Sequence, residues 1–205
     1  MRQLAGFLLC TSVVLVRSVW QKPAFCGEHE CPEFKVVEKG SGYEKRNYAS
    51  ATWVTTSSAG EYKDASAETY FKLRNYLNTS NELNKAMPMA IPSVTMMFPT
   101  TGLEVMKNFT RFFFIPAHLG PAPKPNDTSI SVKEVPPKDM YIRQIEGRVS
   151  TVAEWVQHAN DLERYTMKSG FMLCDICPLL YFSRVLYKMK KMTLISICCR
   201  MIYDK

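Results

Sequence analysis

A proline-rich segment at residues 116–127, PAHLGPAPKPND, does most to limit how this chain folds. It contains four prolines and one glycine. Proline has no backbone N–H to donate to a helix or a sheet, so we predict a loop here. Strand-like and helix-like patterns occur on both sides of this loop. The sequence therefore predicts an arrangement of strands and one helix that occurs twice, although the two halves share no visible sequence repeat.

The half before the loop contains two strand candidates and one helix candidate. Tyr43 to Thr56, YEKRNYASATWVTT, is rich in aromatic and β-branched residues and is predicted to form one long strand. Glu61 to Leu77 places apolar side chains at three- and four-residue spacings, which is typical of a helix with one buried stripe. Phe109 to Ile115, FTRFFFI, is the strongest strand candidate. An extended crossing with one short strand is predicted between the helix and this strand.

The half after the loop repeats these signals. Strands are predicted at Ser129 to Val135 and Met140 to Glu146, and a helix is predicted at Thr151 to Tyr165. Thr151 and Glu154 have the spacing of a capping box, which satisfies free N–H groups at the start of a helix. The predicted buried face of this helix comprises Ala153, Trp155, Val156, Ala159 and Leu162. The pattern indicates an α+β fold.

The amino terminus predicts export. Arg2 is followed by an uncharged apolar run from Leu4 to Val16, which has the length of a signal-peptide core and is too short to span a bilayer. Residues 1–20 are therefore interpreted as a signal peptide. Three N-x-S/T motifs, at Asn78, Asn108 and Asn126, are candidate glycosylation sites and agree with export. A secreted or extracellular glycoprotein is expected.

The seven cysteines fall into separate groups. In an oxidising compartment, Cys26 and Cys31 can close a disulfide loop, and a metal site that includes His29 is the alternative. Cys174 and Cys177 have the spacing of a redox motif, but no strand-to-helix unit leads into them. Thiol redox chemistry is therefore a third, less favoured class of function.

The sequence carries no enzyme signature. It has no glycine-rich phosphate loop, no G-x-S-x-G motif and no H-E-x-x-H motif, and its histidines are only His29, His118 and His158. No catalytic residue and no metal site are predicted. The net charge of +7 is compatible with anionic partners, but the one dense basic cluster, Lys188 to Lys191, does not predict nucleic-acid binding. Charges also interrupt the apolar runs near the carboxyl terminus, so no transmembrane segment is expected in the mature chain.

An ordered series of motifs resembles the SOUL haem-binding protein family. YEKRNYASATWVTT is similar to the family's first strand, with its Tyr-Glu-x-Arg-x-Tyr run. Further similarities follow in order: Phe71-Lys72-Leu73 with Tyr76, the segment KAMPMAIPSV, a phenylalanine-rich strand that ends at Ile115-Pro116, Met140-Tyr-Ile-Arg143, and Gly147. The resemblance covers about Tyr43 to Tyr165 and is nearest to the heme-binding protein 2 branch of the family.

This resemblance implies a distorted antiparallel β-barrel of two pseudo-symmetric halves with two flanking helices. It also implies non-covalent binding of haem or a related tetrapyrrole. The candidate binding residues are Lys72 and Arg74, as contacts for the propionates, and Met87 and Met89, as apolar lining. The position of the family's candidate axial histidine is occupied here by Asn47, which is a poor ligand for iron.

The carboxyl terminus departs from the family. The closing Tyr-x-x-Pro and Asn-Glu-Val-Trp segments are absent after Lys168, so the barrel is expected to be incomplete at this end. Four parts are therefore expected: the signal peptide, an N-terminal segment at 21–42, a SOUL-like domain at 43–172 and an atypical tail at 173–205. The resemblance also implies an alternative without haem binding, a protein-interaction module linked to cell death or membrane permeability through Val152 to Tyr165.

Overall fold

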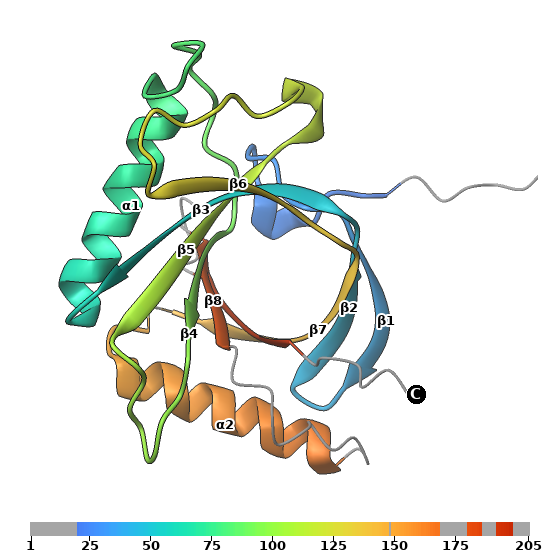
Figure 1. The fold of residues 1–205 in the computed structure, drawn as a ribbon. Coiled ribbons are helices and arrows are strands. Elements are labelled where there is room, and N and C mark those ends of the chain that lie inside the picture. The colour runs from blue at the N-terminus through green and yellow to red at the C-terminus, as the bar shows by residue number, and fades with distance from the viewer. Residues whose placement is uncertain (1–19, 148, 169–179, 186–191, 199–205) are drawn as a thin grey trace, which may run out of the picture.

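The computed structural model describes residues 20–147, 149–168, 180–185 and 192–198 (Figure 1). Two helices, α1 (Tyr62–Asn78) and α2 (Val152–Lys168), accompany the sheet. The strands are β1 (Phe34–Gly40), β2 (Tyr43–Tyr48), β3 (Ala51–Ala59), β4 (Ser93–Met97), β5 (Asn108–Ile115), β6 (Ile130–Val135), β7 (Lys138–Glu146), β8 (Leu180–Val185) and β9 (Met192–Cys198). Short 3-10 turns lie at Ala24–Cys26 and Ala117–Leu119. The α+β class predicted from the sequence is confirmed.

The nine strands form one antiparallel sheet in the order β1-β2-β7-β9-β8-β4-β5-β3-β6. From β2 to β6, exchanging β2, β3, β4 and β5 with β6, β7, β8 and β9 gives the same order read in reverse, so every pair of neighbours is kept. The chain thus contains two β-β-α-β-β units, which meet where β4 pairs with β8. Each unit places its first strand beside the other unit, since β2 pairs with β7 and β6 pairs with β3.

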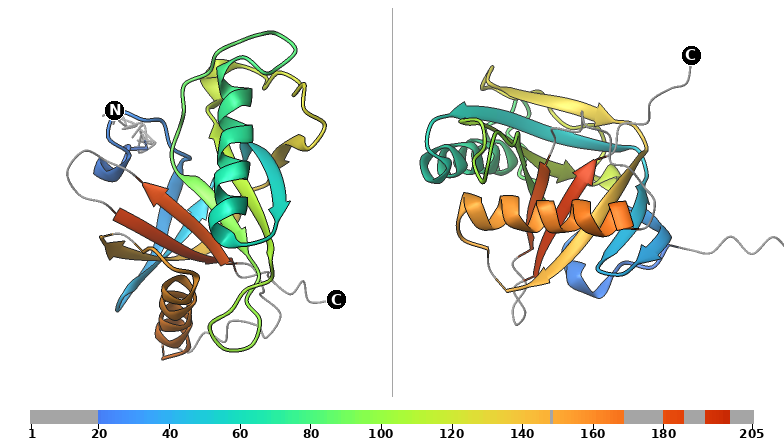
Figure 2. Two further views of the ribbon diagram at one scale, coloured as in Figure 1. Left: turned by 90° about the vertical axis from the view of Figure 1, so that its left-hand side faces the viewer. Right: turned by 90° about the horizontal axis from the view of Figure 1, so that it is seen from below.

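The two helices lie outside the strongly curved sheet, at different places along it (Figures 1 and 2). Helix α1 packs on β3 and β5, and α2 contacts β2, β7 and β9. The buried stripe of α1 comprises Ala65, Thr69, Leu73, Tyr76 and Leu77, in agreement with the predicted spacing. Each helix thereby covers a separate cluster of core side chains, one beside Leu73 and Phe113 and the other beside Trp155 and Leu162.

Helix α2 begins with the predicted capping box. The Glu154 backbone N–H donates to the Thr151 hydroxyl at 3.2 Å, and the Thr151 N–H donates to the Glu154 carboxylate at 3.2 Å. These bonds satisfy donors that the first turn leaves free. Trp155, Val156, Ala159 and Leu162 are buried as predicted. Ala153 is exposed instead, because the buried stripe begins only at Trp155.

The prediction of one long strand from Tyr43 to Thr56 is wrong. The chain forms β2, leaves the sheet at residues 49 and 50, and re-enters it as β3. The two strands have different partners, since β2 lies between β1 and β7 whereas β3 lies between β5 and β6. The Ala49 N–H donates to the Glu33 carbonyl at 3.0 Å, outside the β3 ladders. Composition cannot reveal such a change of partner, because both segments are equally suited to a strand.

The tail after residue 173, which was expected to be atypical, supplies two strands to the sheet. Strands β8 and β9 come from the tail and occupy the centre of the strand order, between β7 and β4. Their sequences, LYFSRV and MTLISIC, have the aromatic and β-branched content that suits strands even without the family's closing motifs. Strand β1 comes from the N-terminal segment and lies outside the two β-β-α-β-β units. The signal-peptide core and the Cys174 and Cys177 pair lie outside the described residues.

Candidate functional site

A pocket with a volume of about 730 Å³ lies between α1, β4, the start of α2 and the loop at Cys26 to Cys31. Helix α1 contributes Tyr62 and Tyr70, α2 contributes Trp155, and the segment before β4 contributes Met89 and Ile91. These side chains give the pocket a largely aromatic and aliphatic wall. The volume lies within the range of about 300–1,000 Å³ that is usual for small-molecule sites.

Arg111 of β5 places a buried positive charge in this pocket. The residue is 8% exposed, and its guanidinium donates to the hydroxyls of Ser66 at 2.6 Å, Thr69 at 3.2 Å and Ser93 at 2.8 Å. It also donates to the Ser66 carbonyl at 3.2 Å. All of these acceptors are neutral, and within the described part of the chain no carboxylate forms a salt bridge with Arg111.

Burial lowers the pKa of the Arg111 guanidinium below its ordinary value, because the charged form loses hydration. Arginine nevertheless stays protonated in proteins near neutral pH. An isolated buried charge is unfavourable unless it is paired. The pocket therefore has a strong electrostatic preference for an anionic group.

A second buried arginine differs from Arg111 because it has a carboxylate partner. Arg46 of β2 is 1% exposed, and it donates to the Glu44 carboxylate through Nε at 2.9 Å and Nη2 at 2.7 Å. Its guanidinium lies 4.3 Å from the ring centroid of Phe34 and 5.5 Å from that of Phe25. Arg46 thus has both a carboxylate partner and aromatic stacking, and it attaches the N-terminal segment to the sheet.

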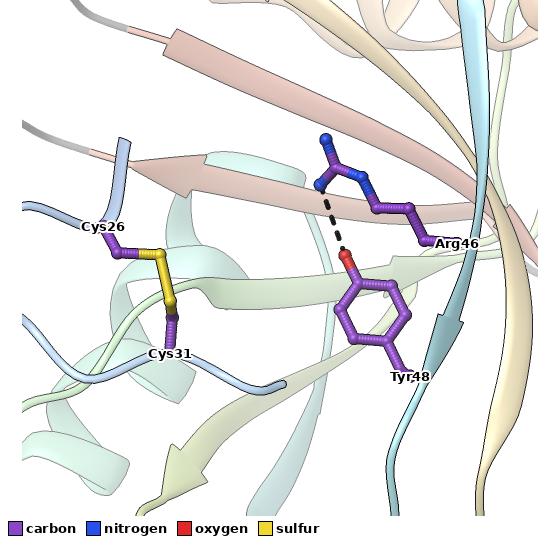
Figure 3. The surroundings of a disulfide bond; sticks show 4 residues. All are labelled: Cys26, Cys31, Arg46 and Tyr48. Atoms are coloured by element: carbon purple, nitrogen blue, oxygen red, sulfur yellow. Dashed lines mark hydrogen bonds between the residues drawn. A yellow bond between two sulfur atoms is a disulfide. The ribbon is translucent and has the colours of Figure 1, made fainter. Parts of the chain in front are cut away.

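The Cys26–Cys31 disulfide expected from the sequence is present in the structure, with an S–S distance of 2.04 Å. Figure 3 shows this disulfide beside Arg46 and Tyr48. Both cysteines are buried in a cluster with Ile91 and Ile142. Burial raises the pKa of the Tyr48 hydroxyl. Among the residues that the structure describes, no group of His, Cys, Asp and Glu side chains could hold a metal ion.

The four residues predicted to contact the ligand do not gather at one place. Met89 lines the pocket, where its sulfur lies 3.9 Å from the Tyr70 hydroxyl. Met87 is buried in the core cluster beneath α1. Arg74 is exposed, lies one helical turn after the pocket residue Tyr70, and donates to its hydroxyl at 3.2 Å. Of the four, only Met89 belongs to the pocket wall.

Lys72 points away from the pocket. It lies nine residues after Lys63, which lines the pocket, and at about 100° per residue this spacing places it roughly opposite on the helix. Its ammonium is 2.8 Å from the Glu68 carboxylate, and this hydrogen bond raises the pKa of Lys72. Lys72 is therefore half-buried on another face of α1, with a partner of its own.

Asn47 is also remote from the pocket. Its side-chain amide donates to the Asp139 carboxylate at 2.6 Å, across the β2–β7 ladder. Asp139 lies 3.3 Å from the Lys45 ammonium as well. The position where the family has its candidate axial histidine is thus used for contacts between strands.

Sequence reasoning did not identify Arg111, although a signal was available. Alternate residues of a strand face the same side, and Arg111 shares its side of β5 with Phe109, Phe113 and Ile115. A charged residue in the buried register of a phenylalanine-rich strand is unusual and often functional. The glycosylation candidates Asn78, Asn108 and Asn126 are all exposed.

The curved sheet with two outer helices holds a pocket whose size and apolar wall are typical of a small-molecule site. The family model described as SOUL heme-binding protein matches residues 29–177, and the chain belongs to this family. Heme-binding protein 1 of Xenopus laevis is 26% identical over 147 residues, which cover 69% of this chain and 77% of that protein. Heme-binding protein 2 of Homo sapiens is 27% identical over 120 residues, which cover 58% of each chain.

Solved structures with little sequence similarity share the fold. The C-terminal domain of EcmrR superposes with a TM-score of 0.55 at 9% identity, covering 78% of this chain and 98% of that domain. A hydrolase from Listeria innocua gives a TM-score of 0.51 at 8% identity, covering 76% of this chain and 90% of its own. At such low identity these similarities concern the fold alone. Neither described helix is long and apolar enough to cross a membrane.

Proposed function

We propose that this protein binds haem or a related tetrapyrrole non-covalently in the pocket between α1, β4 and the start of α2. Membership of the SOUL heme-binding protein family supports this class of ligand. The observation that carries the proposal is the buried guanidinium of Arg111, which has neutral partners only among the described residues. A propionate carboxylate would supply the missing negative charge.

The residues around Arg111 suit this role. Hydrogen bonds from its guanidinium to Ser66, Thr69 and Ser93 fix the orientation of the planar group. Four of the five guanidinium N–H groups donate in the bonds of Arg111, which leaves one Nη1 N–H to donate to a carboxylate oxygen. A guanidinium that is already fixed loses little freedom on binding. Lys63, which is exposed and lines the same pocket, adds a second cation. The pocket therefore offers positive charge for two acidic groups.

The remaining wall suits a flat apolar ring. Tyr62, Tyr70 and Trp155 provide aromatic surface, and Met89 provides an adaptable thioether side chain. A bound haem would add its own redox-active iron and two carboxylates. The protein's part is to exclude water from the ring and to compensate the acidic groups. This is a binding role, and we propose no catalytic step.

Titration of the full chain with hemin tests the proposal. We expect a saturable change in the Soret absorbance. Arg111→Met should weaken binding by about 30-fold or more, because loss of one partner of a buried charge pair costs about 2–5 kcal/mol. Lys72 and Arg74 lie outside the pocket wall, and surface cations contribute about 1 kcal/mol or less, so Lys72→Met and Arg74→Met should change the affinity by about fivefold at most. The dimethyl ester of hemin should bind the wild type and Arg111→Met equally.

Two results would contradict this assignment. Unchanged affinity in Arg111→Met would remove the role of the buried guanidinium. A larger loss in Lys72→Met or Arg74→Met would favour the binding residues predicted from the sequence. If the wild type binds no hemin, the alternative of a protein-interaction module at Val152 to Tyr165 is favoured instead.

We propose further that the protein is exported and glycosylated. The Cys26–Cys31 disulfide and the exposure of Asn78, Asn108 and Asn126 support this proposal. The signal-peptide core at Leu4 to Val16 lies outside the described residues. The strong curvature of the sheet (Figure 1) supports the finer proposal that the fold is a distorted barrel of two related halves.

A further inference from the structure

His29 lies at the wall of the pocket because of the disulfide loop. It stands between Cys26 and Cys31 in sequence, and its backbone N–H donates to the Cys26 carbonyl at 3.0 Å. The next residue, Glu30, accepts a hydrogen bond from the Ile91 N–H at 2.8 Å. Ile91 and His29 both line the pocket. A covalent bond and two backbone hydrogen bonds therefore hold the loop beside the pocket.

The imidazole of His29 is available for a ligand. It is exposed, and in the described part of the chain it makes no side-chain hydrogen bond or ion pair. The other two histidines are placed differently. His118 is exposed in the 3-10 turn after β5, and His158 of α2 lies beside Asp161. His29 is the one histidine among the pocket residues that the structure describes.

We infer that His29 is an axial ligand of the iron when haem occupies this pocket, an inference that rests on the proposed function. Imidazole nitrogen is the commonest protein ligand of haem iron. An imidazole nitrogen of His29 would donate its lone pair to the iron in place of a water molecule, without any transfer of electrons.

His29 does not occupy the position of the family's candidate axial histidine. That position is Asn47, whose amide is bound to Asp139 on the sheet. His29 instead comes from the N-terminal segment before β1, and the disulfide places it at the pocket. Met89 brings a thioether to the same pocket and is the rival ligand among the described residues.

Paired titrations with hemin and metal-free protoporphyrin IX test the inference on the full chain. Only hemin has an iron to ligate, so protoporphyrin IX reports packing and charge alone. His29→Ala should weaken hemin binding by at least about tenfold, since even groups that only orient a metal ligand contribute about 10–100-fold. It should leave protoporphyrin IX binding unchanged. Free imidazole added to the hemin complex of His29→Ala should restore the wild-type absorbance spectrum.

Control variants separate the alternatives. His118→Ala removes an exposed histidine outside the pocket and should match the wild type in every titration. Met89→Leu tests the rival ligand, and a changed hemin spectrum in this variant together with a wild-type spectrum in His29→Ala would assign the iron ligand to Met89 and overturn the inference. If His29→Ala gives the wild-type spectrum and affinity while both porphyrins bind, the ligand assignment is overturned and the proposed function survives. If neither porphyrin binds the wild type, both are overturned.

Discussion

Arg111→Met tests whether the buried guanidinium is needed to bind the ligand or to stabilise the fold. Methionine keeps much of the apolar length of arginine and removes the charge. The substitution deletes four hydrogen bonds, to the hydroxyls of Ser66, Thr69 and Ser93 and to the Ser66 carbonyl. At about 1 kcal/mol each, these bonds contribute about 4 kcal/mol to the free energy of unfolding.

Removal of the buried charge is expected to raise the free energy of unfolding, which opposes the loss of the four hydrogen bonds. The effective penalty of a buried ion without a counter-ion is several kcal/mol, and Arg111 has no carboxylate partner among the described residues. The Thr69 hydroxyl keeps its bond to the Ala65 carbonyl, at 2.7 Å. Ser66 and Ser93 are only half-buried and can reach water. We therefore expect the unfolding free energy of ligand-free Arg111→Met to lie within about 2 kcal/mol of the wild type.

Urea unfolding of the ligand-free chain, followed by tryptophan fluorescence, measures this difference. Arg46→Met is the matched control, because Arg46 is as deeply buried but is paired with Glu44. Breaking a buried pair costs about 3–5 kcal/mol. Because the Glu44 side chain keeps 27% of its exposure, we expect about 2–3 kcal/mol for Arg46→Met. A loss above about 4 kcal/mol in Arg111→Met would show that Arg111 is a structural residue and would refute this reasoning.

Two further predictions concern the N-terminal loop and helix α2. The disulfide joins residues that are five positions apart, so replacing both Cys26 and Cys31 by serine should lower the unfolding free energy by about 2 kcal/mol in the chain-entropy relation. Equal urea midpoints for this double variant and the wild type would contradict that estimate. Burial and the neighbouring charge of Arg143 hold the pKa of His158 below its usual value. Since the unfolded chain then takes up the proton more readily, stability should fall as the pH drops below about 6.5, and His158→Gln should show a weaker fall in urea midpoint from pH 7 to pH 5.

Much of the local structure was predictable from the sequence, because it depends on neighbouring residues. The stripe of α1 follows from its three- and four-residue spacing, and the capping box of α2 follows from Thr151 and Glu154. The short Cys26–Cys31 loop was predictable for the same reason, since its ends are close in the chain. The order of motifs also indicated the family. Each of these features depends on interactions over a few residues or on similarity read directly from the sequence.

The pairing of strands and the composition of the pocket depended on tertiary structure. The break between β2 and β3, and the insertion of β8 and β9 between β7 and β4, depend on partners that are distant in the chain. The pocket likewise combines His29, Met89, Arg111 and Trp155 from four separate segments. Lys72 was predicted to contact a propionate and does lie on the helix that lines the pocket. Because of the rotation of α1 on the sheet, however, its side chain points away from the pocket and pairs with Glu68. Sequence periodicity determines which face of an element is buried, whereas only the packed fold determines which distant side chains meet there.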